Sequence, residues 1–139
     1  MGSGSPFSYA VLRVVPRVER GERLNAGVVV FCRPLRYLAA RTHLDERRLV
    51  ALWPDLDPGD VRAHLIAIER VAAGDPGAGP IARLDETARF HWLVAPSSTI
   101  VQPSAVHTGL ATDPAEQLDR LFESLVLVPP RRDDPQSLP

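Results

Sequence analysis

The sequence predicts an α+β fold in which a small antiparallel sheet packs against three to four helices. Apolar, β-branched runs crowd the N-terminal third, where a glycine turn joins the first two and a proline turn leads into the third. Helix start signals follow only after these runs. One more strand-like run precedes the last helix start signal. Strands grouped in this way and followed by helices are typical of α+β domains.

The N-terminal part of the sheet is predicted as one long hairpin over residues 9–32. Residues 25–32 are apolar on both faces, as a central strand would be. Within them Gly27 allows a bulge or a close approach of another backbone. Gly21 is the natural turn between the two strands, whereas Pro16 interrupts the ladder because it has no N–H to donate.

The remaining elements follow in chain order. Each predicted helix except the third begins at an aspartate that suits an N-cap, and two of these aspartates precede a proline, which is favoured in the first turn. Glycine readily adopts the left-handed conformation of a C-cap, so Gly74 ends the longest helix. The predicted elements are a strand at 37–42, helices at 46–52, between Asp57 and Gly74 and at 81–92, a strand at 97–102, and a helix beginning at Asp113-Pro114.

We expect residues 7–128 to form a single domain. The chain has 139 residues, of which 45% are hydrophobic and 24% charged, as in an ordinary soluble globular protein. Residues 1–6 look like a leader or a cloning scar, and residues 129–139 have the composition of a disordered tail. There is no signal-peptide pattern and no apolar run of about 20 residues, so we expect a cytoplasmic protein without membrane contact.

Composition argues against several kinds of site. All 16 basic residues are arginine, so a P-loop and a Schiff base, which both need a lysine amine, are absent. The four histidines show no metal-ligand spacing, and no zinc, nucleophile or dinucleotide motif occurs. We therefore expect no metal and no cofactor. The one cysteine, Cys32, ends an apolar run and is expected to be a core residue.

The first candidate site is the segment between the two hairpin strands, residues 16–24, which we call the arm. Its charges suit either a solvated turn or a recognition surface, and they are carried by Arg17, Glu19, Arg20, Glu22 and Arg23. In an extended chain Arg13 and Arg17 share a face, where two guanidinium groups could hold a carboxylate or a phosphate. A cross-strand pair of Glu19 with Arg23 is the simpler alternative.

The second candidate site combines hydroxyls with an imidazole in the C-terminal third of the chain. Ser98 and Thr99 follow Pro96, and His107 and Thr108 come a few residues later, before a glycine. Hydroxyls, a histidine and a glycine with an accessible N–H are the parts of an anion pocket. They are also the parts of an ordinary turn, which is the interpretation we favour.

Several stretches resemble the bacterial domain-of-unknown-function 3037 family, over nearly the whole chain between Tyr9 and Val128. The resemblance is carried by residues 9–11 (YAV), 15–22 (VPRVERGE), 24–30 (LNAGVVV), 90–93 (FHWL), 98–99 (ST), 106–110 (VHTGL) and 113–114 (DP) and by the helix with 121–122 (LF). The family has no assigned activity, so the resemblance implies no catalytic residue. It implies instead an accessory or regulatory protein encoded beside a toxin-type protein kinase, which is then a candidate partner.

Three functions stay open at this point, and the leading one is a non-enzymatic interaction or regulatory module. Such a module would work with a protein partner, for example a kinase encoded nearby, or as a homodimer; the binding candidates are Arg13, Arg17, Glu19, Arg23, Asn25, Ser98, Thr99, His107 and Thr108. The second is an enzyme or a small-anion or phosphate binder that uses Arg13, Arg17, Ser98, Thr99 and His107. The third is nucleic-acid binding through the arginine-rich hairpin, against which the net charge of −1 and the interleaved glutamates argue.

Overall fold

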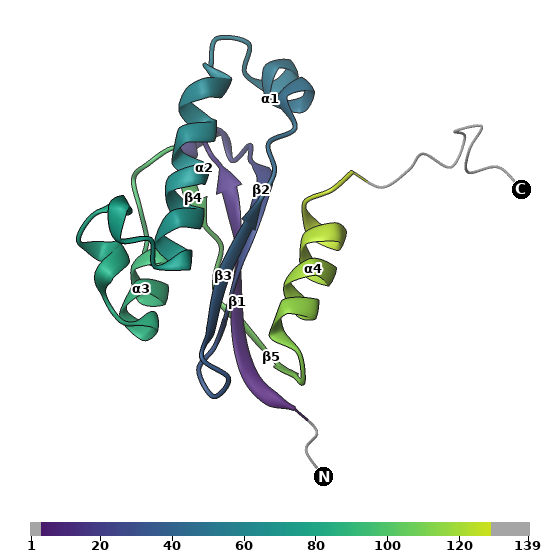
Figure 1. Cartoon of the computed structure of the whole chain (residues 1–139). Helices are drawn as coiled ribbons and strands as arrows, with labels where there is room; N and C mark the ends of the chain where they lie inside the picture. Colours follow the sequence, from purple (N-terminus) through teal and green to yellow (C-terminus); the bar gives the residue numbers. More distant parts are fainter. Residues whose placement is uncertain (1–3, 129–139) are drawn as a thin grey trace, which may run out of the picture.

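The computed structural model describes residues 4–128, which form a five-stranded antiparallel sheet with four α-helices (Figure 1). The strands are β1 (Ser5–Val14), β2 (Leu24–Cys32), β3 (Tyr37–Thr42), β4 (Val101–Pro103) and β5 (His107–Ala111). The helices are α1 (Glu46–Leu52), α2 (Pro58–Ala73), α3 (Glu86–Leu93) and α4 (Pro114–Leu125). The predicted α+β class is confirmed.

β1 is the central strand of the sheet. The order is β3-β2-β1, and both β4 and β5 pair with the remaining edge of β1. β5 takes residues 5–9 of that edge and β4 takes residues 12–14. Between them, the Val11 N–H donates to the Ser104 Oγ over 2.9 Å, and the Ser104 N–H donates to the Val11 carbonyl over 2.8 Å. Ser104 thus continues the pairing of β1 across the gap between two short strands.

A bulge interrupts the confirmed hairpin of β1 and β2. Leu12 pairs with Gly27 but Arg13 pairs with Asn25, so Ala26 is the extra residue on β2. An extra residue changes which face of a strand each later side chain occupies, because side chains alternate with a period of two. Ala26 consequently packs on the face of the sheet that α2 and α3 cover, whereas Asn25 points to the face that α4 covers.

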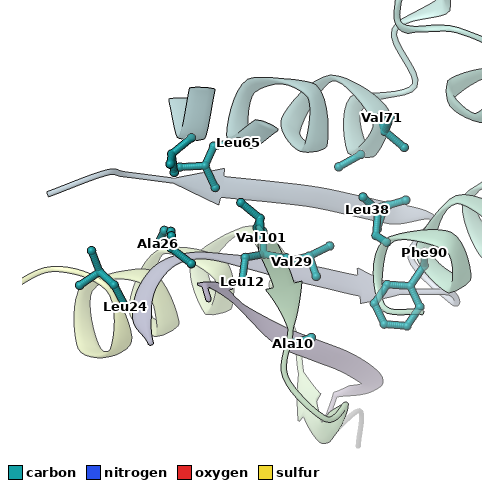
Figure 2. Close-up of a cluster of buried hydrophobic side chains, with 14 of the residues drawn as sticks. Ala10, Leu12, Leu24, Ala26, Val29, Leu38, Leu65, Val71, Phe90 and Val101 are labelled. Carbon is teal, nitrogen blue, oxygen red and sulfur yellow. The ribbon is translucent and has the colours of Figure 1, made fainter. Parts of the chain in front are cut away.

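The two faces of the sheet bury two separate cores. The larger core lies under α1, α2 and α3, and Figure 2 shows its central side chains, among them Ala10, Leu12, Leu24, Ala26, Val29, Leu38, Leu65, Val71, Phe90 and Val101. The smaller core lies under α4 and consists of Phe7, Val28, Val30, Cys32, Ala111, Leu118, Phe122 and Val126. The sheet is therefore the middle layer of three, as Figure 1 also shows.

Aspartates cap all four α-helices of the described range. The side chains of Asp45, Asp57 and Asp113 accept backbone N–H groups of the first turn, at distances of 2.9 to 3.3 Å, as the sequence predicts. Asp85 does the same for α3, where it accepts the Ala88 N–H over 2.8 Å. Gly74 ends α2 in the left-handed conformation, with φ of 72°, which confirms the predicted C-cap.

The prediction of a third helix over residues 81–92 is wrong in the extent of the helix. Ile81–Arg83 is a short 3-10 turn, the next residue is extended, and α3 begins only after Asp85. Asp85 starts a new helix because its carboxylate takes up one of the free N–H groups at a helix start. The later start turns Phe90 and Leu93 toward the core and leaves Trp92 half exposed.

The edge strands also differ from the prediction. Of the strand predicted at 97–102, only Val101 and Gln102 are in a strand, β4, which extends to Pro103. β5 lies where the sequence predicts a turn. β1 begins at Ser5, inside the predicted leader of residues 1–6, because Ser5 and Pro6 pair with β5. The predicted tail of residues 129–139 lies outside the described residues.

Candidate functional site

The arm, residues 16–24, forms one short 3-10 turn over Val18–Arg20. Gly21 closes the turn with φ of 70°, and its N–H donates to the Val18 carbonyl over 3.1 Å. The side chain of Val18 is 68% exposed. The 3-10 turn therefore presents the apolar side chain of Val18 to the surface, and none of its three residues is buried.

The arm and the loop after α1 enclose a pocket of about 350 Å³, lined by Pro16, Arg17, Arg20, Glu22, Leu52, Trp53, Pro54, Asp55 and Leu56. Trp53 is only 9% exposed and belongs to the larger core. Its indole Nε1 is buried without a hydrogen-bond acceptor in the described part of the chain. The pocket, which we call the arm pocket, thus joins a rigid aromatic wall to the charged arm.

Arg17 carries a charge in the arm pocket that no carboxylate of the described residues neutralises. Arg20 forms an ion pair with Glu22, and this hydrogen bond lowers the pKa of the Glu22 carboxyl. Arg17 forms no ion pair within residues 4–128, and the predicted pair of Glu19 with Arg23 is not formed there either. A guanidinium group without a carboxylate can accept one from outside.

Arg13 lies on the opposite side of the sheet from the arm pocket. It alternates along β1 with Leu12 and Val14, which belong to the larger core, so its side chain points toward the α4 side. Burial, and after it the charge of Arg23, lowers the pKa of Arg13. Arg23 and not Arg17 is therefore the neighbouring charge, and the structure does not bring Arg13 and Arg17 together.

Asn25 connects this side of the sheet to α4. It pairs with Arg13 across the hairpin, and its Nδ2 donates to the Leu125 carbonyl over 3.0 Å. That carbonyl belongs to the last turn of α4, where carbonyl groups lack partners within the helix. Asn25 thus has a defined structural contact at the C-terminal end of α4.

The predicted cluster of hydroxyls is an ordinary turn. The hydroxyls of Ser97 and Thr99 lie 2.8 Å apart, and the Thr99 hydroxyl donates to the Val101 carbonyl over 2.8 Å. Ser98 is exposed beside them. These bonds use up the polar groups locally, as serine and threonine commonly do in turns.

His107 lies elsewhere, on β5. It pairs with Tyr9, and the two rings stack with centroids 5.2 Å apart, while Thr108 is exposed opposite Ser8. The five residues considered for an enzyme or anion binder therefore occupy four places: the α4 side of β1, the arm pocket, the turn before β4, and β5. No single pocket unites them.

Thr99 also lines a second pocket, of about 260 Å³, between α2, α3 and the edge of β4. Its lining is mostly apolar and consists of Leu12, His64, Ala67, Ile68, Trp92, Leu93, Ala95, Pro96, Ser97, Thr99, Val101 and Pro103. Concave, mostly apolar sites are typical of small-molecule pockets, yet this one holds few polar groups that would orient a ligand.

Other kinds of site find no support in residues 4–128. No three or more His, Cys, Asp and Glu side chains are grouped there so as to hold a metal ion. Cys32 is buried, and its Sγ lies 3.5 Å from the Pro6 carbonyl. Among the helices of this range, none has the length and apolar character of a membrane span. The arm pocket, by contrast, combines charged, apolar and aromatic groups in one concave place.

Sequence reasoning found only part of this pocket. Arg17 was predicted as a site residue, but Leu52, Trp53 and Asp55 were not. Trp53 and Pro54 directly follow the predicted helix at 46–52, where a proline indicates a helix end and gives no sign of a pocket. The pairing of this loop with the arm depends on how Leu49 and Trp53 pack into the larger core, which no local pattern shows.

Comparison with known proteins identifies the family of the chain. The family model "Protein of unknown function (DUF3037)" matches residues 9–126, which is most of the chain and includes the arm, α4 and every core residue except Phe7. No curated protein and no solved structure matches the chain. On the extent of this match, the chain belongs to the DUF3037 family.

Proposed function

We propose that this protein is a non-enzymatic, cytoplasmic interaction module that binds a protein partner at the arm pocket. The observation that carries the proposal is the placement of Arg17, a charge without an ion pair in the described range, in a pocket walled by the core residue Trp53. Arginine and tryptophan are the residue types most enriched among binding hot spots.

The surface around the arm pocket has the mixed character of a protein interface. Val18 and Leu52 are 68% and 41% exposed, and each projects an apolar side chain beside the charged residues. Interfaces combine an apolar centre with a polar rim, and their arginines commonly form bidentate pairs with a carboxylate. We therefore expect the partner to insert an acidic side chain toward Arg17 and to cover Val18.

Nucleic acid is a poorer fit to the same surface. Glu19 and Glu22 lie in the arm, and Asp55 lines the pocket, so negative charges are interleaved with the arginines. A phosphate backbone needs a face of one sign. The kinase partner that the family resemblance suggests, or a second copy of this chain, fits a mixed surface better.

The experiment begins with affinity capture from the native host, after which the captured protein is purified and titrated by calorimetry. Arg17→Ala should weaken binding by about 2 kcal/mol, roughly 30-fold, because a hot-spot arginine loses its paired carboxylate. The matched control is Arg33→Ala, which removes an exposed arginine from the turn between β2 and β3, at the other end of the hairpin. The control should change the affinity by less than twofold.

Two results would count against the proposal. Equal affinity of the Arg17→Ala and wild-type proteins would remove the arm pocket as the binding site. A self-associating chain, seen as a dimer by light scattering and unaffected by added partner, would replace the heterologous partner with a homodimer. Arg17 is exposed and makes no ion pair in the described range, so its loss should leave the melting temperature nearly unchanged.

A further inference from the structure

Two arginines face the α4 side of the sheet at the arm end of β1 and β2. Arg13 pairs directly with Asn25 across the hairpin, and Arg23 comes two residues before Asn25. Because side chains alternate along an extended chain, Arg23 and Asn25 share a face, and Arg23 is a diagonal neighbour of Arg13. Arg13 is half-buried and Arg23 is exposed, so the pair is open to solution.

This pair of positive charges has no counter-charge in the described range. Neither arginine forms an ion pair within residues 4–128. The pKa of Arg13 is lowered by burial and then by the charge of Arg23, which agrees with two like charges held close together. Like charges side by side in a partly desolvated place are unfavourable unless an anion joins them.

Arg13 also carries a donor without an acceptor. Its Nε is buried and forms no hydrogen bond in the described part of the chain. Buried donors are almost always paired, and an exception calls for an explanation such as a ligand. The missing acceptor has to be small enough to reach a half-buried group and should carry negative charge.

The C-terminal end of α4 is the alternative acceptor, and it accounts for only part of the charge. The Leu125 carbonyl there is bonded by Asn25, whose Nδ2 lies 3.0 Å away. A helix end carries about half an elementary charge, whereas Arg13 and Arg23 together carry two. Most of the positive charge is left for another partner.

We propose that Arg13 and Arg23 bind an oxyanion, a phosphate or a carboxylate, on the α4 side of β1. Guanidinium groups form short, paired hydrogen bonds with such groups, and the anion would supply the acceptor that Arg13 Nε lacks. The stacked rings of Tyr9 and His107 lie on the same side of β1, farther along the strand. They offer an aromatic surface to a phosphate ligand that carries a planar ring, such as a nucleotide.

The test uses the full chain in chloride buffer of constant ionic strength, titrated with inorganic phosphate, AMP and succinate. We expect millimolar or tighter binding of at least one probe, which Arg13→Gln and Arg23→Gln should each weaken by about tenfold or more. The double variant Arg47→Gln, Arg48→Gln is the matched control, because it removes two exposed arginines of α1 that form no ion pair in the described range. This control and Arg17→Ala should bind within twofold of the wild type.

The comparison of probes identifies the source of the anion. Tighter binding of AMP than of phosphate indicates a nucleotide, equal binding indicates free phosphate, and preference for succinate indicates a carboxylate ligand. A second measurement needs no variant: the Nε–H resonance of Arg13 in the wild-type spectrum should shift on titration with the probe that binds.

The proposal is overturned if none of the three probes binds at millimolar concentration, or if the Arg13 Nε–H resonance stays unchanged while a probe binds. It is equally overturned if the α1 control loses as much affinity as the Arg13 and Arg23 variants, since binding would then follow net charge alone. Failure here leaves the arm pocket untouched, because Arg17 lies on the other side of the sheet.

Discussion

Ser104 offers the sharpest test of how this sheet is held together. β4 and β5 each pair with part of β1, and the backbone N–H of Val11 falls between the two parts. The Ser104 Oγ accepts that N–H over 2.9 Å, and the hydroxyl in turn donates to the Ala105 carbonyl over 2.9 Å. Ser104→Ala removes the acceptor and leaves the Val11 N–H with no partner among the described residues.

The size of the effect follows from burial. Val11 and Ser104 are 6% and 8% exposed, so water has little access to the freed N–H group. A buried donor left unpaired costs about 1–3 kcal/mol, and the middle of that range is about 2 kcal/mol. For a domain of this size, about 1 kcal/mol corresponds to roughly 3–4 °C in melting temperature, so a fall of about 6–8 °C is expected.

The assay is urea denaturation beside a thermal melt. The denaturant dependence should keep its slope, because the surface exposed on unfolding does not change, while the midpoint falls. Ser98→Ala is the control, since Ser98 is exposed and its hydroxyl makes no hydrogen bond in the described range. If Ser104→Ala costs no more than this control, less than about 0.5 kcal/mol, then Ser104 does not support the edge of the sheet and the reasoning fails.

Two further predictions concern the hairpin. Gly27→Ala should destabilise the protein by about 1–3 kcal/mol in the same urea assay, because the new Cβ would lie 2.9 Å from Thr42 Cγ2 and 3.0 Å from the Arg41 carbonyl oxygen; a neutral substitution would show that β3 can move away. Cys32 should resist a thiol reagent in the native protein and react after unfolding, and Cys32→Ala should cost about 1–2 kcal/mol, because the side chain is wholly buried in the smaller core. Fast labelling of the native protein would place the thiol at the surface instead.

Local chemistry made much of the fold predictable. Asp45, Asp57 and Asp113 cap helices because a short carboxylate can reach the free N–H groups of the next turn, a requirement that the sequence alone displays. The strand at 37–42 was predicted with the bounds that the structure has. Asp85 is also an N-cap, but the apolar spacing of residues 81–92 continues across it and predicts a helix that begins too early.

Elements that depend on a partner far away in the chain could not be predicted from the sequence. β5 buries only Ala111 among its five residues, so it lacks the apolar alternation that marks a strand. It is extended because β1 offers a free edge over residues 5–9, far away in the chain. The arm pocket also depends on distant contacts, since Trp53 lies beside the arm because it is buried in the larger core together with Leu49 of α1.

A bulge in β2 and a bend after β1 together explain why the arginines of the hairpin do not pair as the sequence predicts. Continuous alternation would put Arg13 and Arg17 on one face, and that is the expectation that an extended chain gives. In the structure the extra residue Ala26 places Asn25 opposite Arg13, which brings Arg23 to the α4 side. β1 ends at Val14 and the chain bends at Pro16, so the alternation stops before it reaches Arg17, which lines the arm pocket with Trp53. One hairpin thus places Arg17 in the arm pocket and Arg13 with Arg23 on the other face of the sheet, so the two proposed sites share no arginine.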